Sequence, residues 1–426
     1  MKNITMSLVH ITFFVFILSG HLICIIVSAK QHRKTGKSVA PAPSGIESGG
    51  DSKSFNVLDY GAVGNGQSDD TSAFEKAWAD ACKVQGSTTA MLVPDKYSFK
   101  LKPVSFPGEC QSNIVFQLDG TIVASTNPED WGSGDIKWLD FTSLKGLTIQ
   151  GSGIVDGQGS HWWNEYTTTE NKLSGKPTAL RVVDGTNVKV AGITIRNSQQ
   201  AHLKFDNCVG VDVSEITITS PGDSPNTDGI HLQNSQNVAI YNSKIGCGDD
   251  AISIQTGCSG INIHDVNCGP SHGISIGSLG KDGTTASVSD VTVRDSKISV
   301  SDNGVRIKTW QGGSGSVSDV TFSNIQVTGV KTAIVIDQYY SQSQTNGEDK
   351  TSSAVAVSGI NFHSITGDYS VLPMSLVCSN AIPCKGIIFS DIELKSSGKD
   401  ADPVCSNAYG VLKDGPTFKC LQNGNP

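Results

Sequence analysis

The chain has 426 residues, 46 of them glycine, and a formal net charge of −8. A protein that binds nucleic-acid phosphates needs a basic surface, so this charge argues against a nucleic-acid partner. Few stretches have helical periodicity, and turn-forming residues are abundant, which together predict an all-β fold with many turns.

Residues 1–29 have the pattern of a secretory signal peptide, because Lys2 precedes an apolar run from Ile11 to Val27 and small residues follow it. Cleavage near Ala29 would remove one of the 11 cysteines and leave an even number, which suits the oxidising environment outside the cell. A membrane anchor is the alternative, but His21 interrupts the run and no strong stop signal follows. We therefore expect a secreted, extracellular protein that has no membrane attachment after cleavage.

Residues 30–53 begin with basic residues and continue as a Pro/Ser/Gly-rich run, which predicts a linker without a fold of its own. The remainder, 54–426, is predicted to form one domain. Residues 55–60 have the pattern of a strand that leads into a glycine turn. The one convincing helix is 72–82, with capping residues at 69–71. An apolar helix at this place is expected to cover the open end of a repeat array.

One short phrase occurs four times in the middle of the chain. It is DGIHLQ from residue 228, DAISIQ from 250, HGISIG from 272 and NGVRIK from 303. A repeat of this length is typical of a solenoid, in which each coil covers the apolar face of the next. Because branched apolar residues alternate with polar ones, each copy is predicted to be a strand.

Further strand and turn units are expected along the rest of the chain, at 114–118, 147–149, 180–183, 188–195, 203–213, 317–327, 333–337, 355–365 and 386–394. Asparagines are expected to support the bends at positions 197, 207, 234 and 324. The polar stretch 341–353 is predicted to be a loop, and the segment after Asp400 to close the second end of the array.

Proximity in the sequence favours disulfides between Cys378 and Cys384 and between Cys405 and Cys420, with Cys82 and Cys110 as a further plausible pair. It suggests no partners for the cysteines at 208, 247, 258 and 268. Since these are scattered among strands, without histidines at ligand spacing, no metal site is expected.

Stacking the four phrases in register places their first residues on neighbouring coils, about 4.8 Å apart. That position holds Asp228, Asp250, His272 and Asn303, and Asp249 is adjacent to Asp250. Carboxylates this close repel one another, so at least one should have a raised pKa and retain a proton. Glycoside hydrolysis needs such a protonated acid together with an ionised base or nucleophile. A single Asp beside a glycine would be a turn residue, but three acids and a histidine in one register favour a catalytic cluster.

Arg306 and Lys308 are two residues apart on the fourth strand, so their side chains can leave the same face. Two fixed cations beside a sugar-cleaving site imply an anionic sugar, although a solvated surface pair is the alternative. One conflict remains in this interpretation. Asp228 has the strand parity of Ile230, which should face the core, so the chain must bend at Gly229 for Asp228 to face outward.

Four motifs, 226–228, 248–250, 271–273 and 306–308, resemble in order and spacing the signature motifs of the polygalacturonases, glycoside hydrolase family 28. Further similarity at 55–62, 151–157 and 335–340 extends the resemblance over essentially the whole chain after the linker, and it is similar above all to the plant branch. The resemblance implies a right-handed parallel β-helix and inverting hydrolysis of α-1,4-linked galacturonate in pectin. We accordingly expect a monomer that acts at the cell wall without a cofactor.

The resemblance also implies a role for each motif residue. Asp249 would be the general acid, Asp228 and Asp250 would position and deprotonate water, and His272 would keep the acid correctly hydrogen-bonded. The expected substrate-binding residues are Asn226, Arg306, Lys308 and Tyr340.

Some positions depart from the family pattern. Ser271 stands where most members have Gly, a change expected to have a modest effect, and Ala251 where many have Cys. Ser287 and Ser341 also occupy places where relatives often have Cys, so the disulfide pattern stays open.

Three rival functions remain: a sibling hydrolase of rhamnogalacturonan or xylogalacturonan, a calcium-dependent pectate lyase, and a non-catalytic pectin-binding protein. The sequence has no dense acidic calcium cluster beside a lone basic residue, which argues against the lyase. It keeps all three acids, which argues against the binding protein. No motif decides between endo and exo attack.

Overall fold

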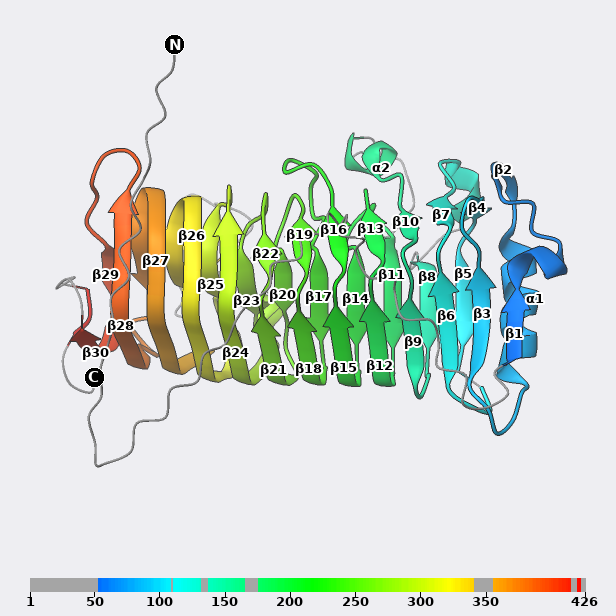
Figure 1. Cartoon of the computed structure of the whole chain (residues 1–426). Coiled ribbons are helices and arrows are strands. Elements are labelled where there is room, and N and C mark those ends of the chain that lie inside the picture. The colour runs from blue at the N-terminus through cyan, green and yellow to red at the C-terminus, as the bar shows by residue number, and fades with distance from the viewer. Residues whose placement is uncertain are drawn as a thin grey trace, which may run out of the picture. The chain divides into compact units, whose positions relative to one another are not determined.

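The computed structural model describes residues 53–108, 110–131, 137–164, 175–340, 355–414 and 420–422. The predicted signal peptide, nearly all of the predicted linker, and the predicted loop 341–353 lie outside these ranges. Within them, parallel strands stack coil upon coil as a right-handed parallel β-helix, the predicted fold (Figure 1). None of the helices in these ranges is long and apolar enough to cross a bilayer.

Each coil contributes strands to three parallel sheets, which we name A, B and C. Sheet A carries the repeated phrases and consists of β5 (Val104–Pro107), β8 (Lys137–Thr142), β11 (Thr178–Val183), β14 (Leu203–Asp206), β17 (Ile230–Gln233), β20 (Ile252–Ile254), β23 (Ile274–Leu279), β25 (Asn303–Trp310) and β29 (Val404–Ser406), together with parts of β26 and β27.

Sheet B includes β1 (Lys53–Asn56), β3 (Thr89–Val93), β6 (Ile114–Leu118), β9 (Leu147–Gln150), β12 (Thr186–Ala191), β15 (Val209–Ser214), β18 (Gln236–Tyr241), β21 (Cys258–His264) and β30 (Ala408–Asp414). Sheet C includes β2 (Asn65–Asp69), β4 (Ser98–Leu101), β7 (Thr121–Ala124), β10 (Ile154–Asp156), β13 (Thr194–Arg196), β16 (Thr217–Thr219), β19 (Lys244–Gly246) and β22 (Asn267–Cys268). Four long strands bend from one sheet into the next: β24 (Thr285–Ser299), β26 (Ser314–Tyr340), β27 (Ala356–Val377) and β28 (Cys384–Ser396).

Rows of identical or similar side chains fill the interior. Ile230, Ile252 and Ile274 pair in register on β17, β20 and β23, and all three are fully buried. Val305 continues the row on β25. Each coil therefore covers the apolar row of its neighbour, as the repeat predicted. The four asparagines predicted at bends, 197, 207, 234 and 324, all have positive φ angles.

The beginning of the folded region differs in part from the prediction. β1 ends at Asn56, and residues 57–60 form a 3₁₀ helix, η1 (Val57–Tyr60), in place of the expected strand. The Asn56 side chain accepts a hydrogen bond from Leu58 N, and Gly61 ends the turn with a φ of 93°. These local signals outweigh the alternating pattern. Three further short helices are η2 (Pro128–Trp131), α2 (Ser160–Asn164) and η3 (Lys281–Gly283).

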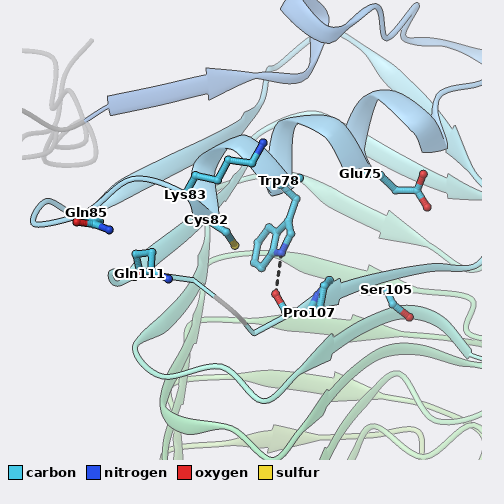
Figure 2. A pocket seen from close by; sticks show the side chains of 9 residues that line it. Glu75, Trp78, Cys82, Lys83, Gln85, Ser105, Pro107 and Gln111 are labelled. Carbon is cyan, nitrogen blue, oxygen red and sulfur yellow. Dashed lines mark hydrogen bonds between the residues drawn. The ribbon is translucent and has the colours of Figure 1, made fainter.

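The predicted helix is α1 (Thr71–Cys82), and it lies beside β1 at one end of the stack (Figure 1). Its buried face includes Phe74 and Trp78, and the Trp78 indole donates a hydrogen bond to Pro107 O. A cavity of about 610 Å³ lies between this helix and the strand that contains Ser105 (Figure 2). None of the predicted site residues lines this cavity. The helix lies at the end of the stack, the place expected for an end cap.

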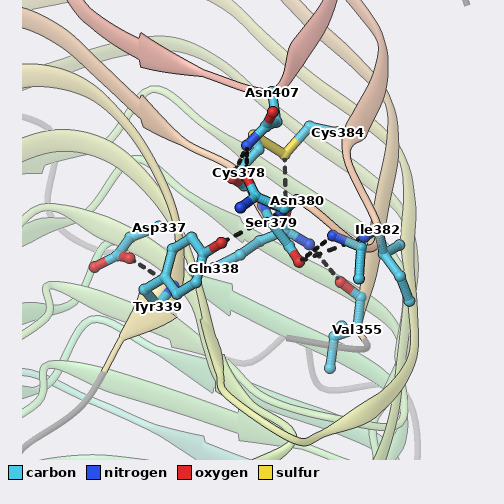
Figure 3. Close-up of a disulfide and its surroundings, with 11 residues drawn as sticks. Asp337, Gln338, Tyr339, Val355, Cys378, Ser379, Asn380, Ile382, Cys384 and Asn407 are labelled. Carbon is cyan, nitrogen blue, oxygen red and sulfur yellow. Dashed lines mark hydrogen bonds between the residues drawn. A yellow bond between two sulfur atoms is a disulfide. The ribbon is translucent and has the colours of Figure 1, made fainter. Parts of the chain in front are cut away.

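The other end is closed by β29 and β30, which pair with β27 and β28. The disulfide Cys378–Cys384 braces this region (Figure 3), and the other two suggested disulfides, Cys82–Cys110 and Cys405–Cys420, also form. Buried Gln338 fixes the loop that this disulfide closes, because it accepts a hydrogen bond from Ser379 N. It also donates a hydrogen bond to Val355 O. The cysteines at 208, 247, 258 and 268 are buried free thiols.

Candidate active site

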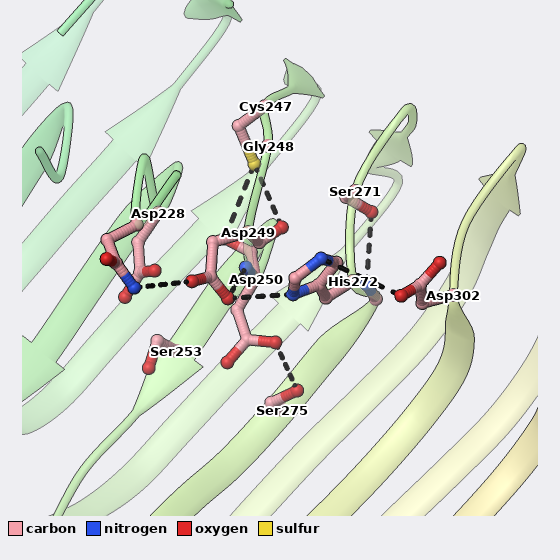
Figure 4. Close-up of polar contacts among 12 residues, drawn as sticks. Asp228, Cys247, Gly248, Asp249, Asp250, Ser253, Ser271, His272, Ser275 and Asp302 are labelled. Carbon is pink, nitrogen blue, oxygen red and sulfur yellow. Dashed lines mark hydrogen bonds and ion pairs between the residues drawn. The ribbon is translucent and has the colours of Figure 1, made fainter. Parts of the chain in front are cut away.

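The predicted acids lie in successive turns that lead from sheet C into sheet A (Figure 4). Because β17 begins only at Ile230, Asp228 belongs to the turn and not to the strand, which removes the parity conflict. The turns pack very tightly. A Cβ at Gly229 would lie 2.4 Å from the carbonyl oxygen of Ala251 on the next coil, so glycine is required there. Gly229 N also donates a 2.9 Å hydrogen bond to Asp250 O, which ties the two acidic turns together.

Asp250 is the buried anchor of the site. Its side chain is 2% exposed, and three side chains donate to it. Arg306 Nη2 lies 2.6 Å and Ser275 Oγ 2.7 Å from Oδ1, while Lys308 Nζ lies 2.7 Å from Oδ2. Arg306 Nε also donates to Ser275 Oγ at 3.0 Å. The two predicted cations are therefore held at fixed positions by a carboxylate of the protein itself.

Asp249, the preceding residue of the same turn, is more accessible, with its side chain 19% exposed. Its Oδ2 accepts a hydrogen bond from Asn226 Nδ2 at 3.2 Å, and its Oδ1 lies 3.0 Å from His272 Nδ1. The backbone N–H of Asp250 donates to the same Oδ1 at 2.8 Å. The other ring nitrogen of His272 lies 3.7 Å from Asp302, which pairs in turn with Lys331. The imidazole thus stands between two carboxylates.

Asp228 lies on the neighbouring coil and is held by two histidines that the sequence motifs did not indicate. Its Oδ2 is 3.0 Å from His231 Nδ1, three residues further along the chain. Beneath it, fully buried His202 donates from Nδ1 to Asp228 O and lies 2.7 Å from Ser220 Oγ through Nε2. Burial lowers the pKa of His202 to about 4, so this residue is a neutral support of the backbone.

Asp228, Asp249 and His272 have shifted pKa values. Burial raises the pKa of Asp228, and the charges of Asp249 and Asp250 add to this effect, while His231 opposes it. Burial would also raise the pKa of Asp249, but the hydrogen bond and charge of His272, with help from Lys308, lower it overall. The hydrogen bond to Asp249 raises the pKa of His272. Within this cluster the raised carboxyl pKa therefore belongs to Asp228. The opposite pKa shifts of Asp249 and His272 favour an ion pair between them while His272 is protonated.

Tyr340 lies at the rim of the same cluster. Its ring centroid is 5.2 Å from Lys308 Nζ, a cation–π contact, and 5.8 Å from the Trp310 ring. All eight predicted site residues therefore lie in one cluster, partly buried and partly exposed. The fit of Ser271 also becomes clear, because its hydroxyl accepts a hydrogen bond from Gly273 N and lies 3.1 Å from Ser301 Oγ. This serine supports the His272 turn. Ala251 is fully buried, Ser287 is exposed, and Ser341 lies outside the described residues.

Asp249, Asp250 and His272 also have the donor atoms of a possible metal site, because their ligand atoms lie within 4.8 Å of one another. Both oxygens of Asp250 are already bound by cationic side chains, however. The positive charges of Arg306 and Lys308 would repel an added metal ion. The chemistry that the cluster supports directly is proton transfer between carboxyl groups and a substrate beside a fixed positive charge.

Comparison with known proteins identifies the family of the chain. Residues 82–413 match the model of glycosyl hydrolases family 28. A polygalacturonase of Chamaecyparis obtusa is 41% identical over 87% of this chain and 73% of its own length. A probable polygalacturonase of Arabidopsis thaliana is 41% identical over 84% of this chain and 81% of its own length. Polygalacturonase-2 of Solanum lycopersicum is 38% identical over 84% of this chain and 78% of its own length.

Two solved structures share the fold at lower identity. The endo-xylogalacturonan hydrolase of Aspergillus tubingensis has a TM-score of 0.72 and 22% identity, covering 88% of this chain and 99% of its own. The polygalacturonase of Erwinia carotovora has a TM-score of 0.64 and 22% identity, covering 90% and 100%. With the family model matched over most of the chain and relatives above one-third identity over most of their length, the chain belongs to glycosyl hydrolases family 28.

Proposed function

We propose that this family 28 hydrolase cleaves α-1,4 bonds between galacturonate units of pectin, with inversion at the anomeric carbon. The observation that carries the proposal is the pair of cations, Arg306 and Lys308, fixed by buried Asp250 beside two partly exposed carboxyls, Asp228 and Asp249. The carboxyls supply the acid and base of glycoside hydrolysis. The cations supply binding for a sugar that carries a carboxylate.

Asp249 is proposed as the general acid, with His272 as its partner. In the free protein the pair shares a proton across the 3.0 Å contact between Nδ1 and Oδ1, with the charge on the imidazole. A uronate bound at Lys308 brings negative charge next to Asp249 and offsets the ammonium that lowers the pKa of Asp249. Substrate binding therefore shifts the proton toward Asp249, from which it passes to the oxygen of the leaving sugar.

Asp228 is proposed as the carboxylate that deprotonates the attacking water, and Asp250 is proposed to help position that water indirectly. Of the two, Asp228 is the more exposed, 18% against 2%, so it is the one better able to meet a water molecule. Its raised pKa makes it a stronger base than an ordinary carboxylate once it is ionised. Asp250 acts through the side chains that it holds.

The substrate sugar is proposed to lie between Asn226 and Tyr340, with its carboxylate on Arg306 and Lys308. Asn226 donates a hydrogen bond to Asp249, so it adjoins the acid, and Tyr340 contacts Lys308, so it adjoins the cations. Secretion to the cell wall and action as a monomer are further parts of the proposal. The three disulfides support an oxidising compartment.

The test is to incubate the purified protein with polygalacturonate and to follow reducing ends, absorbance of unsaturated uronate and the anomer of the first product. We expect reducing ends without unsaturated product, unchanged in the presence of EDTA, and β-anomer first. Unsaturated product that EDTA abolishes would indicate a lyase. Turnover of xylogalacturonan or rhamnogalacturonan with none of polygalacturonate would assign the chain to another substrate.

A further inference from the structure

We propose that His202 is a positioning residue of the reaction, which holds Asp228 in its working orientation through the backbone carbonyl of that acid. This inference rests on the proposed function, in which Asp228 deprotonates the attacking water, and deepens it. His202 is fully buried, so it acts on the substrate only through Asp228.

The backbone of Asp228 is fixed from the coil before it. Leu203 pairs with Ile230 in sheet A, and this register places His202 beside the acidic turn. Asp228 O accepts two hydrogen bonds from His202, one from the backbone N at 2.8 Å and one from ring Nδ1 at 2.9 Å. The first is the ordinary contact between successive coils, and the imidazole adds the second. Because a carbonyl oxygen has two lone pairs, both are used, which restricts rotation of the peptide that begins at Asp228.

Ser220 fixes the tautomer of the imidazole. A carbonyl oxygen only accepts hydrogen bonds, so Nδ1 of His202 must carry a hydrogen. In a neutral ring the other nitrogen, Nε2, then has a lone pair, and the Ser220 hydroxyl lies 2.7 Å from it and can donate to it. Burial lowers the pKa of His202 to about 4, which keeps the ring neutral above that pH. Ser220 Oγ, the His202 ring and Asp228 O thus form one directed chain of hydrogen bonds.

The peptide that His202 holds also connects the two acidic turns. Its carbonyl belongs to Asp228 and its N–H to Gly229, which donates to Asp250 O at 2.9 Å. Hydrogen bonds in such a row polarise and strengthen one another. Without the ring donor the Asp228 peptide can rotate, and its carboxyl then moves away from the attacking water. A displacement of about 1 Å can lower a rate about 10²-fold.

Two variants of His202 separate the donor from the rest of the side chain. The amide nitrogen of Asn can occupy the place of Nδ1 and donate to Asp228 O, whereas the amide of Gln reaches the place of Nε2, next to Ser220. For His202→Gln we expect kcat on polygalacturonate to fall about 10–100-fold, because the base is misplaced. KM should stay unchanged, because Arg306 and Lys308 still bind the uronate. His202→Asn should keep kcat within about threefold of wild type, since the donor is retained.

Ser235→Ala is the matched control for the loss of a buried polar contact. Ser235 is fully buried beyond the end of β17, whereas Asp228 precedes the beginning of that strand. Its hydroxyl accepts from Cys208 N and donates to Gln233 O. This control should unfold at a lower urea concentration than wild type, and its kcat, expressed per folded protein, should be that of wild type.

A double variant tests whether His202 acts through the acid. In an Asp228→Asn background, His202→Gln should change the residual kcat by less than about twofold, because residues that act as a unit are not additive. If His202→Gln does not fold, Ser220→Ala replaces it in both backgrounds. With Asp228 present, we expect this milder change to lower kcat about two- to fivefold at unchanged KM, the effect of one hydrogen bond.

Three results would overturn the inference and leave the proposed function intact. They are a wild-type kcat in the variant that folds, equal losses of kcat in His202→Gln and His202→Asn, and a loss in the Asp228→Asn background as large as in the wild type. A wild-type protein that hydrolyses no galacturonan would remove the proposed function, and this inference with it.

Discussion

Replacing Asp250 by Asn tests whether this carboxylate is the structural anchor of the site. The side chain is 2% exposed and accepts from Arg306, Lys308 and Ser275 at 2.6–2.7 Å. Asn keeps the volume and one acceptor oxygen. Its amide nitrogen, however, is a donor and would confront either the guanidinium or the ammonium. The variant leaves two mostly buried cations without a compensating charge.

Removing one partner of a buried ion pair typically lowers the free energy of unfolding by about 3–5 kcal/mol. We take this full range for Asp250→Asn, because Arg306 and Lys308 are only 14% and 7% exposed and water cannot readily replace the carboxylate. Repulsion between the two cations adds to the loss. Without the Asp250 carboxylate, Arg306 and Lys308 should also move from their positions, and most hydrolysis of polygalacturonate should be lost.

The assay is urea unfolding followed by circular dichroism, and the matched control is Asp249→Asn, the same change one residue earlier. Asp249 is 19% exposed, and its ion-pair partner His272 is 36% exposed, so the control should lose less than about 1 kcal/mol. An Asp250→Asn protein as stable as the Asp249→Asn protein would refute the idea that the two cations depend on Asp250.

Four further outcomes are expected. Asp249→Asn should lower kcat about 10²–10⁴-fold, because the amide cannot donate the proton, while oligogalacturonate binding persists; retention of half the wild-type rate would move the acid elsewhere. The raised pKa of His272 means that the ion pair loses its proton as pH rises through that value, so kcat/KM should fall on the alkaline side. His272→Gln should bring this fall to lower pH, and an unchanged pH profile would exclude the pair as the proton source. Because His231 lowers the pKa of Asp228, His231→Asn should raise it, so the acidic limb of kcat/KM, where Asp228 becomes protonated, should move to higher pH; a shift to lower pH would contradict this. Finally, Lys308→Ala should reduce kcat/KM on polygalacturonate by at least tenfold and much less on highly methyl-esterified pectin, and equal losses would mean that the residue does not bind the uronate carboxylate.

The coil architecture could be predicted because the sequence repeats it. Ile230, Ile252 and Ile274 occupy equivalent places in successive phrases and pair in register. Only one side-chain row can point inward at that position. Residues 57–60 show where the alternating pattern fails, since the Asn56 cap and the left-handed Gly61 favour a 3₁₀ turn. Patterning averages over several residues and does not detect one local hydrogen bond.

The site could be located from its motifs, but its internal pairing could not. Arg306 and Lys308 were predicted to face one side of a strand, and they do, yet nothing in the spacing indicated that Asp250 would bind both. His231 was missed although it lies three residues after Asp228. The available signal was register, since His231 shares its row with Lys204 and Arg306. Comparing the residues at equivalent positions of successive coils would have indicated His231.

The binding of Arg306 and Lys308 to Asp250 has a consequence for how a uronate is held. The substrate carboxylate cannot simply take these cations, because that would leave Asp250 buried and without compensating charge. A guanidinium has five N–H donors and an ammonium three. Toward the described residues, Arg306 donates from Nη2 and Nε, and Lys308 donates to Asp250. The uronate is therefore best bound by the remaining donors, with the intramolecular pairs intact. In this arrangement Asp250 keeps the cations in place before the sugar arrives, so little side-chain entropy is lost on binding.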